Sequence, residues 1–297
     1  MKVDFPPTFD IEYYRRVYPE FLGLPDEIVI EHYRRYAEEQ GRTTCIYDRS
    51  EYLKLFLNDA IAKNSLKVLE IGPFNNPFFV GDNVKYFDVL DTETIRERAR
   101  KVSPKFEGVP PKIHYVEPNG DMSIIKEKFD IVFSSHVIEH QPDLVRHLQN
   151  VGNILNDGGM YILVIPDKRY CFDHYRNETK FFEVIDAYVN ENKSHTFKSV
   201  AESNCFRAHN NSFLHWIGVH GSNELKLKEF TDMLETYAQG VKHRKYVNAH
   251  AWCFTPKVFN GIIEGLNKLN LINLKVHRLC HTIWGRFEFC CILERFD

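Results

Sequence analysis

The sequence predicts an α/β fold in which helices cover both faces of a mostly parallel β-sheet. Short apolar runs alternate with helical segments through the middle of the chain. The early runs are apolar almost throughout, as expected for strands that are buried on both faces. The chain has 297 residues, enough for one large α/β domain with a smaller unit attached.

Composition and charge exclude several other classes of protein. Apolar residues make up 43% of the chain and charged residues 27%, which is typical of a folded globular protein. The net charge of −3 gives no basic surface for a nucleic acid. The longest apolar runs are far shorter than the ~20 residues of a membrane span, and no signal peptide is expected. Seven cysteines without a CxxC pair argue against disulfides or structural zinc and favour a cytoplasmic location.

The expected elements follow in chain order. Apolar residues recur at helical spacing over residues 9–42, which predicts an N-terminal helical module within residues 1–45. A helix over about 50–63 begins at Ser50, a good N-cap residue. A helix over about 142–155, with Pro142 in its first turn and Gly158 as its stop, and a helix over 256–269 follow. The expected strands are 67–71, 84–88, 112–116, 129–134, 160–165, 274–279 and 287–293.

One long segment interrupts the alternation of strands and helices. Residues 168–250 are rich in aromatic, histidine and charged residues, and we interpret them as an insertion in a main domain over 46–297. Open α/β sheets bind ligands at the carboxyl ends of their strands, where this insertion would begin. We therefore expect it to hold acceptor-binding residues.

A glycine follows the first strand, in the run Glu70-Ile-Gly-Pro-Phe-Asn-Asn-Pro77. Gly72 allows the backbone to turn sharply and approach a ligand. The run is not GxGxxG, and only about 12 residues separate Gly72 from the second strand, too few for a crossover helix. A dinucleotide-binding loop is therefore disfavoured.

Five pieces of sequence follow one another in a characteristic order: VLEIGP at 68–73, FDVLD at 87–91, NGDM at 119–122, FDIVFSSHVIEHQPDL at 129–144 and LNDGGMYILVIPD at 155–167. In their order and spacing they resemble the class I S-adenosylmethionine (SAM)-dependent methyltransferases over roughly residues 50–170. The resemblance implies a Rossmann-like sheet of seven strands, SAM as the cofactor and S-adenosylhomocysteine (SAH) as its product.

The same resemblance implies roles for individual residues. Asp88 would accept hydrogen bonds from the ribose hydroxyls, with Asp91 as the competing candidate, and Asp121 would lie near the adenine. Asn75 and Asn76 replace the glycines of the family's common E-x-G-x-G pattern. The implied cofactor residues are Glu70, Gly72, Pro73, Asn75, Asp88, Asp121, Ser134, Ser135 and His136.

The run His136-Val-Ile-Glu-His140 also spells H-x-x-E-H, an inverted metalloprotease motif. That motif needs a helix, whereas here it follows a buried strand and leads to Pro142, so zinc proteolysis is disfavoured. Within the methyltransferase resemblance, Glu139 and His140 would orient the loop. No metal site is predicted; a divalent metal held by Asp167 and Asp173 is the alternative.

Two further segments point to the acceptor. Residues 166–176 are similar to a segment of methyltransferases found with glycan-assembly enzymes, and residues 9–42 resemble a helical module attached to some bacterial glycosyltransferases. The resemblance implies O-methylation of a sugar or glycan, and association with glycan-assembly enzymes. The candidate acceptor-binding residues are Asp167, Arg169, Asp173 and Arg176, which would otherwise form a salt-bridged loop.

Methyl transfer to a hydroxyl requires a base, and histidine is the usual one near neutral pH. We expect His215 or His220, followed by His136, to fill this role. Two alternatives stay open: a small-molecule O- or N-methyltransferase unrelated to glycans, and a binding module that has lost methyl transfer. Nucleic-acid methylation is disfavoured, and the sequence does not define the oligomeric state.

Overall fold

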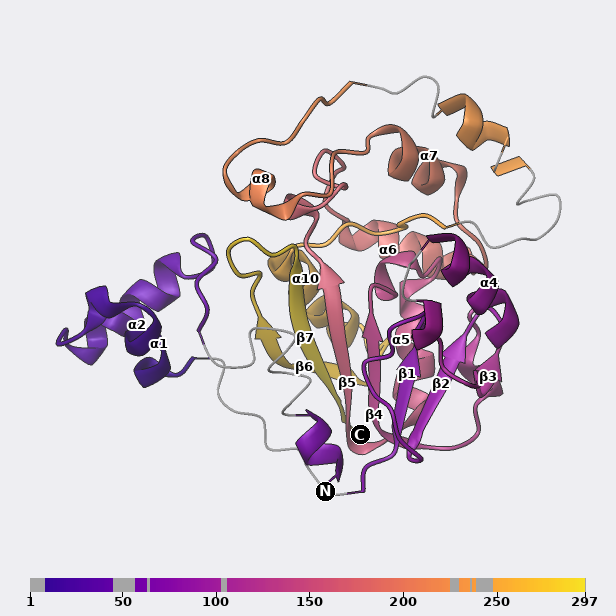
Figure 1. Ribbon diagram of the computed structural model, residues 1–297, viewed down its shortest axis with the longest axis horizontal. Helices are drawn as coiled ribbons and strands as arrows, with labels where there is room; N and C mark the ends of the chain where they lie inside the picture. Colours follow the sequence, from indigo (N-terminus) through magenta and orange to yellow (C-terminus); the bar gives the residue numbers. More distant parts are fainter. Residues whose placement is uncertain are drawn as a thin grey trace.

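A seven-stranded sheet forms the centre of the computed structural model, which describes residues 9–44, 57–62, 65–102, 106–224, 230–235, 237–238 and 248–296 (Figure 1). Its strand order is β3-β2-β1-β4-β5-β7-β6, and only β7 runs antiparallel to its neighbours. This sheet confirms the predicted fold class. The strands are β1 (Val68–Ile71), β2 (Val84–Asp88), β3 (Tyr115–Val116), β4 (Phe129–Ser135), β5 (Leu155–Pro166), β6 (Leu274–Cys280) and β7 (Glu288–Arg295).

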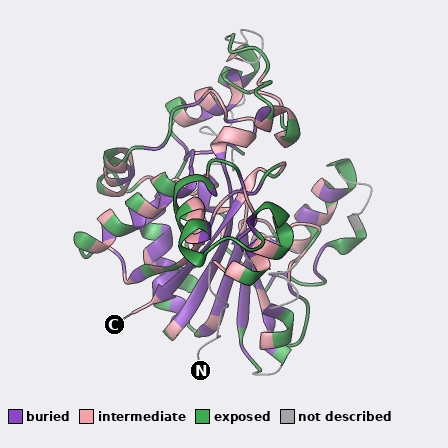
Figure 2. Ribbon diagram, turned by 90° about the vertical axis from the view of Figure 1, so that its left-hand side faces the viewer, coloured by how far each residue is buried: buried purple, intermediate pink, exposed green. Residues whose placement is uncertain are grey.

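Helices cover both faces of the sheet because alternate side chains of each buried strand point to opposite faces. In β5, Tyr161 and Leu163 pack with α5 (Leu144–Ile154), α6 (Phe181–Val189) and α10 (Pro256–Lys268). Ile162 and Val164 pack on the other face, with α4 (Thr92–Val102) and residues 57–62. Figure 2 shows the strands buried between these layers.

Polar side chains fix where two of the helices begin. Asp143 accepts a hydrogen bond from the backbone N–H of Arg146 and so caps α5, and Thr255 caps α10 in the same way. The helix predicted from Pro142 therefore begins after Asp143. It ends at Ile154, so Gly158 is not its stop: Gly158, with φ of +69°, lies within the first residues of β5. Ser50 and the first half of the helix predicted over 50–63 lie outside the described residues.

Helices α1 (Ile11–Val17) and α2 (Asp26–Tyr36) form a small unit beside the sheet (Figure 1). They pack around Tyr14, whose hydroxyl is hydrogen-bonded to Nδ1 of His32. The unit contacts the rest of the chain where the backbone N–H of Trp284 donates to the carbonyl of Gly41 at 2.7 Å. The predicted division at residue 45 stays a prediction.

The predicted insertion contributes to two parts of the fold. Its first helix, α6, packs on the sheet through Val184 and Ala187. Helices α7 (Phe197–Cys205) and α8 (Ser212–Trp216) lie instead beyond the carboxyl ends of the parallel strands, at the top of Figure 1. Among the described helices, none has the length and apolar character needed to cross a membrane.

Candidate active site

A pocket of about 950 Å³ lies at the carboxyl ends of β1, β2 and β4. Its wall includes Gly72, Asp88 and His136 from the strand ends, and Lys193–His195 and Asn248 from the predicted insertion. This volume is at the upper end of the range usual for ligand sites. The pocket therefore joins the expected cofactor side to the expected acceptor side.

The loop after β1 shapes one wall of this pocket. The buried carboxylate of Glu70 accepts hydrogen bonds from the backbone N–H groups of Phe78 (2.7 Å) and Phe79 (3.0 Å), so it holds the loop and does not line the pocket. Gly72 has φ of +67°, and a Cβ there would lie 2.7 Å from Cγ2 of Val137. A side chain at position 72 would therefore strain the backbone and collide with the opposite wall.

The two aspartates after β2 have different surroundings. Asp88 lines the pocket, and burial raises the pKa of its carboxyl to about 6. Asp91 is exposed and caps α4 by accepting from the backbone N–H of Thr94 at 2.8 Å, which lowers its pKa. Of the two, only Asp88 lines the pocket, so it stays the predicted ribose contact. Asp121 lies outside the pocket wall and accepts from the backbone N–H of Ser123, whereas its neighbour Gly120 lines the pocket.

The end of β4 brings His136 into the pocket with φ of +54°, a conformation rare for histidine. Its Nε2 is 2.6 Å from Oε1 of Glu288, and its Nδ1 is 3.6 Å from Oε1 of Glu139. Burial lowers the pKa of His136, but these two carboxylates outweigh burial and raise it to about 10. Both ring nitrogens face acceptors, so His136 is held as an imidazolium, which leaves no lone pair for a base.

The remaining expected cofactor residues do not contribute to the pocket wall. The hydroxyl of Ser134 is buried 2.8 Å from the hydroxyl of Tyr161. Tyr161 in turn contacts Nε2 of His147 at 2.9 Å, so these groups form a hydrogen-bonded network of which only His147 lines the pocket. Pro73, Asn75 and Ser135 lie next to wall residues without lining the pocket themselves.

The four expected acceptor residues form ion pairs with one another, as in the alternative that the sequence left open. The Asp167 carboxylate is fully buried and accepts from the guanidinium of Arg169 and from the hydroxyl of Thr282 at 2.7 Å. Asp173 pairs with Arg176 at 2.7 Å, and both are buried. None of the four lines the pocket.

We expect Asp167→Ala to lower the free energy of unfolding by about 3–5 kcal/mol, because the change leaves Arg169 and Thr282 without their shared partner. Chemical denaturation measures this loss. Asp157→Ala is the matched control: Asp157 also pairs with an arginine, Arg295, at 2.7 Å, but its side chain is 73% exposed. The control should lose at most about 1 kcal/mol. Equal losses in the two variants would contradict a structural role for the buried pair.

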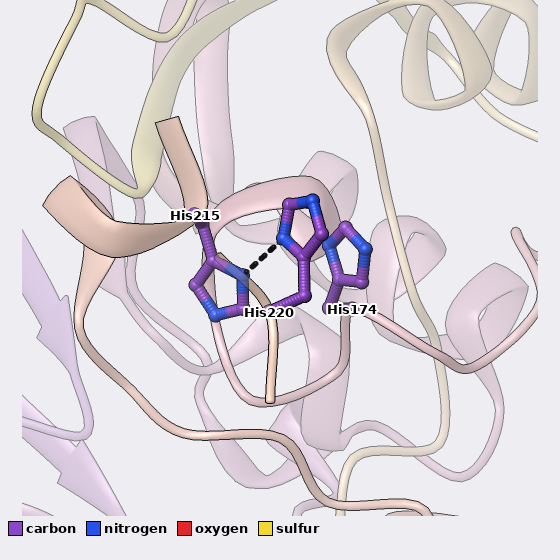
Figure 3. A group of neighbouring side chains, drawn as sticks. All are labelled: His174, His215 and His220. Carbon is purple, nitrogen blue, oxygen red and sulfur yellow. Dashed lines mark hydrogen bonds between the residues drawn. The ribbon is translucent and has the colours of Figure 1, made fainter. Parts of the chain in front are cut away.

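The two histidines expected as bases lie together outside the pocket wall. Figure 3 shows His215 and His220 beside His174, with the Nδ1 atoms of His215 and His220 3.0 Å apart. The ring of His174 stacks on that of His220 at 3.8 Å between centroids. His215 is buried, which lowers its pKa to about 4, and its Nε2 is 3.0 Å from the carbonyl oxygen of His209. The rings of His174, His215 and His220 therefore contact one another.

Sequence reasoning did not single out His195, which does line the pocket. Its side chain is mostly buried, and burial lowers its pKa to about 4, so the ring is neutral. Neither ring nitrogen has a hydrogen-bond partner among the described residues. His195 precedes Thr196, the N-cap of α7, and nothing in the local sequence distinguishes it from the other histidines of the insertion.

Residues 80–163, from before β2 to within β5, match a family model described as a methyltransferase domain. This match supports the predicted enzyme class, a methyltransferase. No curated protein matches the chain.

Solved methyltransferases are distantly similar in structure. The DszA carbon methyltransferase is 12% identical over 83% of this chain and 53% of its own, with a TM-score of 0.40. A SAM-dependent methyltransferase from Clostridium acetobutylicum is 11% identical over 91% of this chain and 99% of its own, with a TM-score of 0.41. The trans-methyltransferase CalH, in complex with SAH, is 13% identical over 84% and 58%, with a TM-score of 0.40. The chain thus spans little more than half the length of DszA and CalH.

Proposed function

We propose that the protein transfers the methyl group of SAM to a hydroxyl of a sugar or glycan, with His195 as the general base. The observation that carries this proposal is the single pocket lined both by the strand ends and by the insertion. A cofactor and an acceptor bound to these two sides would share one enclosed space. Methyl transfer is an in-line displacement, so holding both reactants in one pocket supplies much of the catalysis.

The residues present fit SAM on the strand side. Gly72 leaves room for close approach of a ligand, because a side chain there would fill the space toward Val137. The ionised carboxylate of Asp88 suits a vicinal diol such as the ribose hydroxyls. SAM, when bound, supplies a methyl group activated by a sulfonium. The Asn119–Gly120 backbone on the same side would then face the adenine.

The insertion side of the pocket suits a hydroxyl-rich acceptor. Lys193 offers an ammonium, Ser194 a hydroxyl and Asn248 an amide. Such groups can donate to and accept from several hydroxyls at once. We propose this side, rather than the paired Asp167, Arg169, Asp173 and Arg176, as the acceptor contact surface.

His195 is the pocket histidine in which both ring nitrogens lack a hydrogen-bond partner among the described residues. A neutral imidazole with an unpartnered nitrogen can accept a proton from a hydroxyl as the new C–O bond forms. His136 is held by two carboxylates, and Nε2 of His147 contacts Tyr161. The cytoplasmic location and the association of residues 1–45 with glycan-assembly enzymes remain predictions from sequence.

The test is a transfer assay with SAM labelled in its methyl group. The panel contains monosaccharides, nucleotide sugars and oligosaccharides, with a catechol and a primary amine as non-sugar acceptors. The proposal expects label in a sugar and one SAH per methyl transferred. Label only in the catechol or amine would favour the small-molecule methyltransferase, and SAM binding without transfer to any acceptor would favour a binding module.

A further inference from the structure

Three potential metal ligands lie together beside the pocket: Glu139, His250 and His140, of which His140 lines the pocket wall. One ligand atom from each lies within 4.8 Å of the other two. Oε1 of Glu139 is 3.8 Å from Nε2 of His140 and 3.9 Å from Nε2 of His250, too far for hydrogen bonds. Bonds of about 2.0–2.1 Å to Zn²⁺ would place tetrahedral ligand atoms about 3.4 Å apart. The three ligand atoms would reach this spacing if their side chains moved slightly closer together around an ion.

The hydrogen bonds of the two imidazoles aim their lone pairs at the carboxylate. Nδ1 of His140 donates to the carbonyl of Ala249 at 3.0 Å, and Nδ1 of His250 donates to the carboxylate of Asp173, since each partner can only accept. In the neutral rings, both Nε2 atoms are therefore acceptors. With both rings neutral, three acceptor atoms would lie within 4.8 Å of one another, an arrangement that a cation would stabilise.

The carboxylate of Glu139 is fully buried, and within the described part of the chain neither oxygen has a hydrogen-bond partner. The nearest proton-bearing group is Nδ1 of His136, 3.6 Å away, and the other nitrogen of that ring is bound to Glu288. The ring of His136 lies within ion-pair distance but makes no hydrogen bond to this carboxylate, and a buried carboxylate without hydrogen bonds is costly. A metal ion would bind the carboxylate oxygens directly.

A second layer of contacts holds the ligands in place. The buried Asp173 fixes the ring of His250, and Arg176 donates both to Asp173 at 2.7 Å and to the carbonyl of His250 at 3.0 Å. The backbone N–H groups of Ala251 and Trp252 donate to the carbonyl of Glu139 and join the two ligand-bearing segments. Metal-bound histidines are usually oriented by such a carboxylate or carbonyl.

We propose that Glu139, His140 and His250 bind a divalent transition-metal ion, with Zn²⁺ as the reference, and leave an open coordination position toward the pocket. Two imidazoles and one carboxylate are a common ligand set for catalytic zinc. His140 itself lines the pocket, so the ion would be accessible from the side where the cofactor and acceptor bind. In this proposal Glu139 and His140 of the H-x-x-E-H run are metal ligands. The first histidine of the run, His136, is not a ligand, because its ring contacts Glu288.

The trio His174, His215 and His220 is the rival site, because its ligand atoms are as close together (Figure 3). There, however, the Nδ1 atoms of His215 and His220 already share a hydrogen bond at 3.0 Å, so one imidazole serves as donor to the other. Oxygen ligation by Asp167 and Asp173 is disfavoured, since both carboxylates are engaged by arginines.

The test is titration of the chelator-treated, full-length protein with Co²⁺, followed by visible absorption, and with Zn²⁺ in competition. The matched variants are Glu139→Gln, which keeps the shape but removes the charge, and His140→Asn, which keeps a donor for Ala249 but removes Nε2. His220→Asn changes the rival trio. We expect the first two variants to weaken metal binding by more than about 100-fold, Asp173→Asn to weaken it by about 10- to 100-fold, and His220→Asn to leave this binding event intact.

SAH binding and a cooperative thermal transition establish that each variant is folded. The proposal is overturned if the wild-type protein binds neither Co²⁺ nor Zn²⁺. It is also overturned if the folded Glu139→Gln and His140→Asn variants bind these ions as tightly as the wild-type protein does. If both variants fail to fold, anomalous diffraction at the zinc edge from wild-type crystals decides. A peak between the three ligand atoms supports the proposal, and a peak only at the trio, or none, contradicts it.

Discussion

Replacing His195 by glutamine should lower kcat by about 10²- to 10⁴-fold, the usual contribution of a general base. The ring lies in the pocket wall with no hydrogen-bond partner for either nitrogen among the described residues. Glutamine keeps the side-chain length and polarity but cannot accept a proton. Affinity for SAH should stay the same, because His195 comes from the insertion and not from the strand ends. Steady-state kinetics with the acceptor found in the panel measures both parameters.

Replacing His215 or His220 by glutamine distinguishes His195 as the general base from the two histidines that the sequence predicts for this role. Neither ring lines the pocket, and the two are hydrogen-bonded to each other. We expect these variants to keep most of their kcat. A large loss of kcat at His215 or His220 together with none at His195 would move the role of base to the trio.

Replacing Asp88 by asparagine should weaken SAH binding by about 10- to 100-fold, because hydrogen bonds to a charged acceptor are stronger than those to a neutral one. Asp88 lines the pocket at the end of β2. The matched control is Asp91→Asn, since Asp91 is exposed and serves as the cap of α4. The control should bind SAH as the wild type does. Equal weakening by the two substitutions would contradict a ribose contact at Asp88.

The affinity of wild-type protein for SAH should also fall in acid. Burial raises the pKa of Asp88 to about 6, and the ribose hydroxyls would donate to the ionised form. Ligand binding therefore favours loss of the proton: affinity is constant well above pH 6 and falls below it, by about tenfold from pH 7 to pH 5. Asp88→Asn should show no such fall. A wild-type affinity that stays constant down to pH 5 would contradict this account of Asp88.

The fold was largely predictable because its determinants are local. The run Val84–Asp88 is both the predicted and the observed second strand, and the Asp-Gly-Gly turn precedes the buried part of β5. One boundary that differed depended on a single side chain: Asp143 caps α5, which therefore begins after Pro142. The third strand, predicted over 112–116, spans only Tyr115–Val116. The central sheet and its carboxyl edge thus follow from apolar patterning and turn residues.

The site was less predictable because it depends on contacts between distant segments. The sequence left Asp167 and Arg169 as either acceptor contacts or members of a salt-bridged loop. The structure pairs them with each other, and Thr282 from the β6–β7 connection donates to the buried carboxylate of Asp167. His250 lies 3.9 Å from Glu139 although more than a hundred residues separate them in the chain, so the local sequence contained only two of the three ligands of the proposed metal site. Its sole local signal was the Glu-His pair of the H-x-x-E-H run.

Titration calorimetry of the wild-type protein with SAM and with SAH at pH 7.5 tests the central claim most directly. The pocket at the ends of β1, β2 and β4 predicts one molecule of either compound per chain, bound with micromolar affinity, in competition with each other. An absence of binding by both compounds would contradict the assignment of this pocket to the cofactor, and with it the proposed methyl transfer.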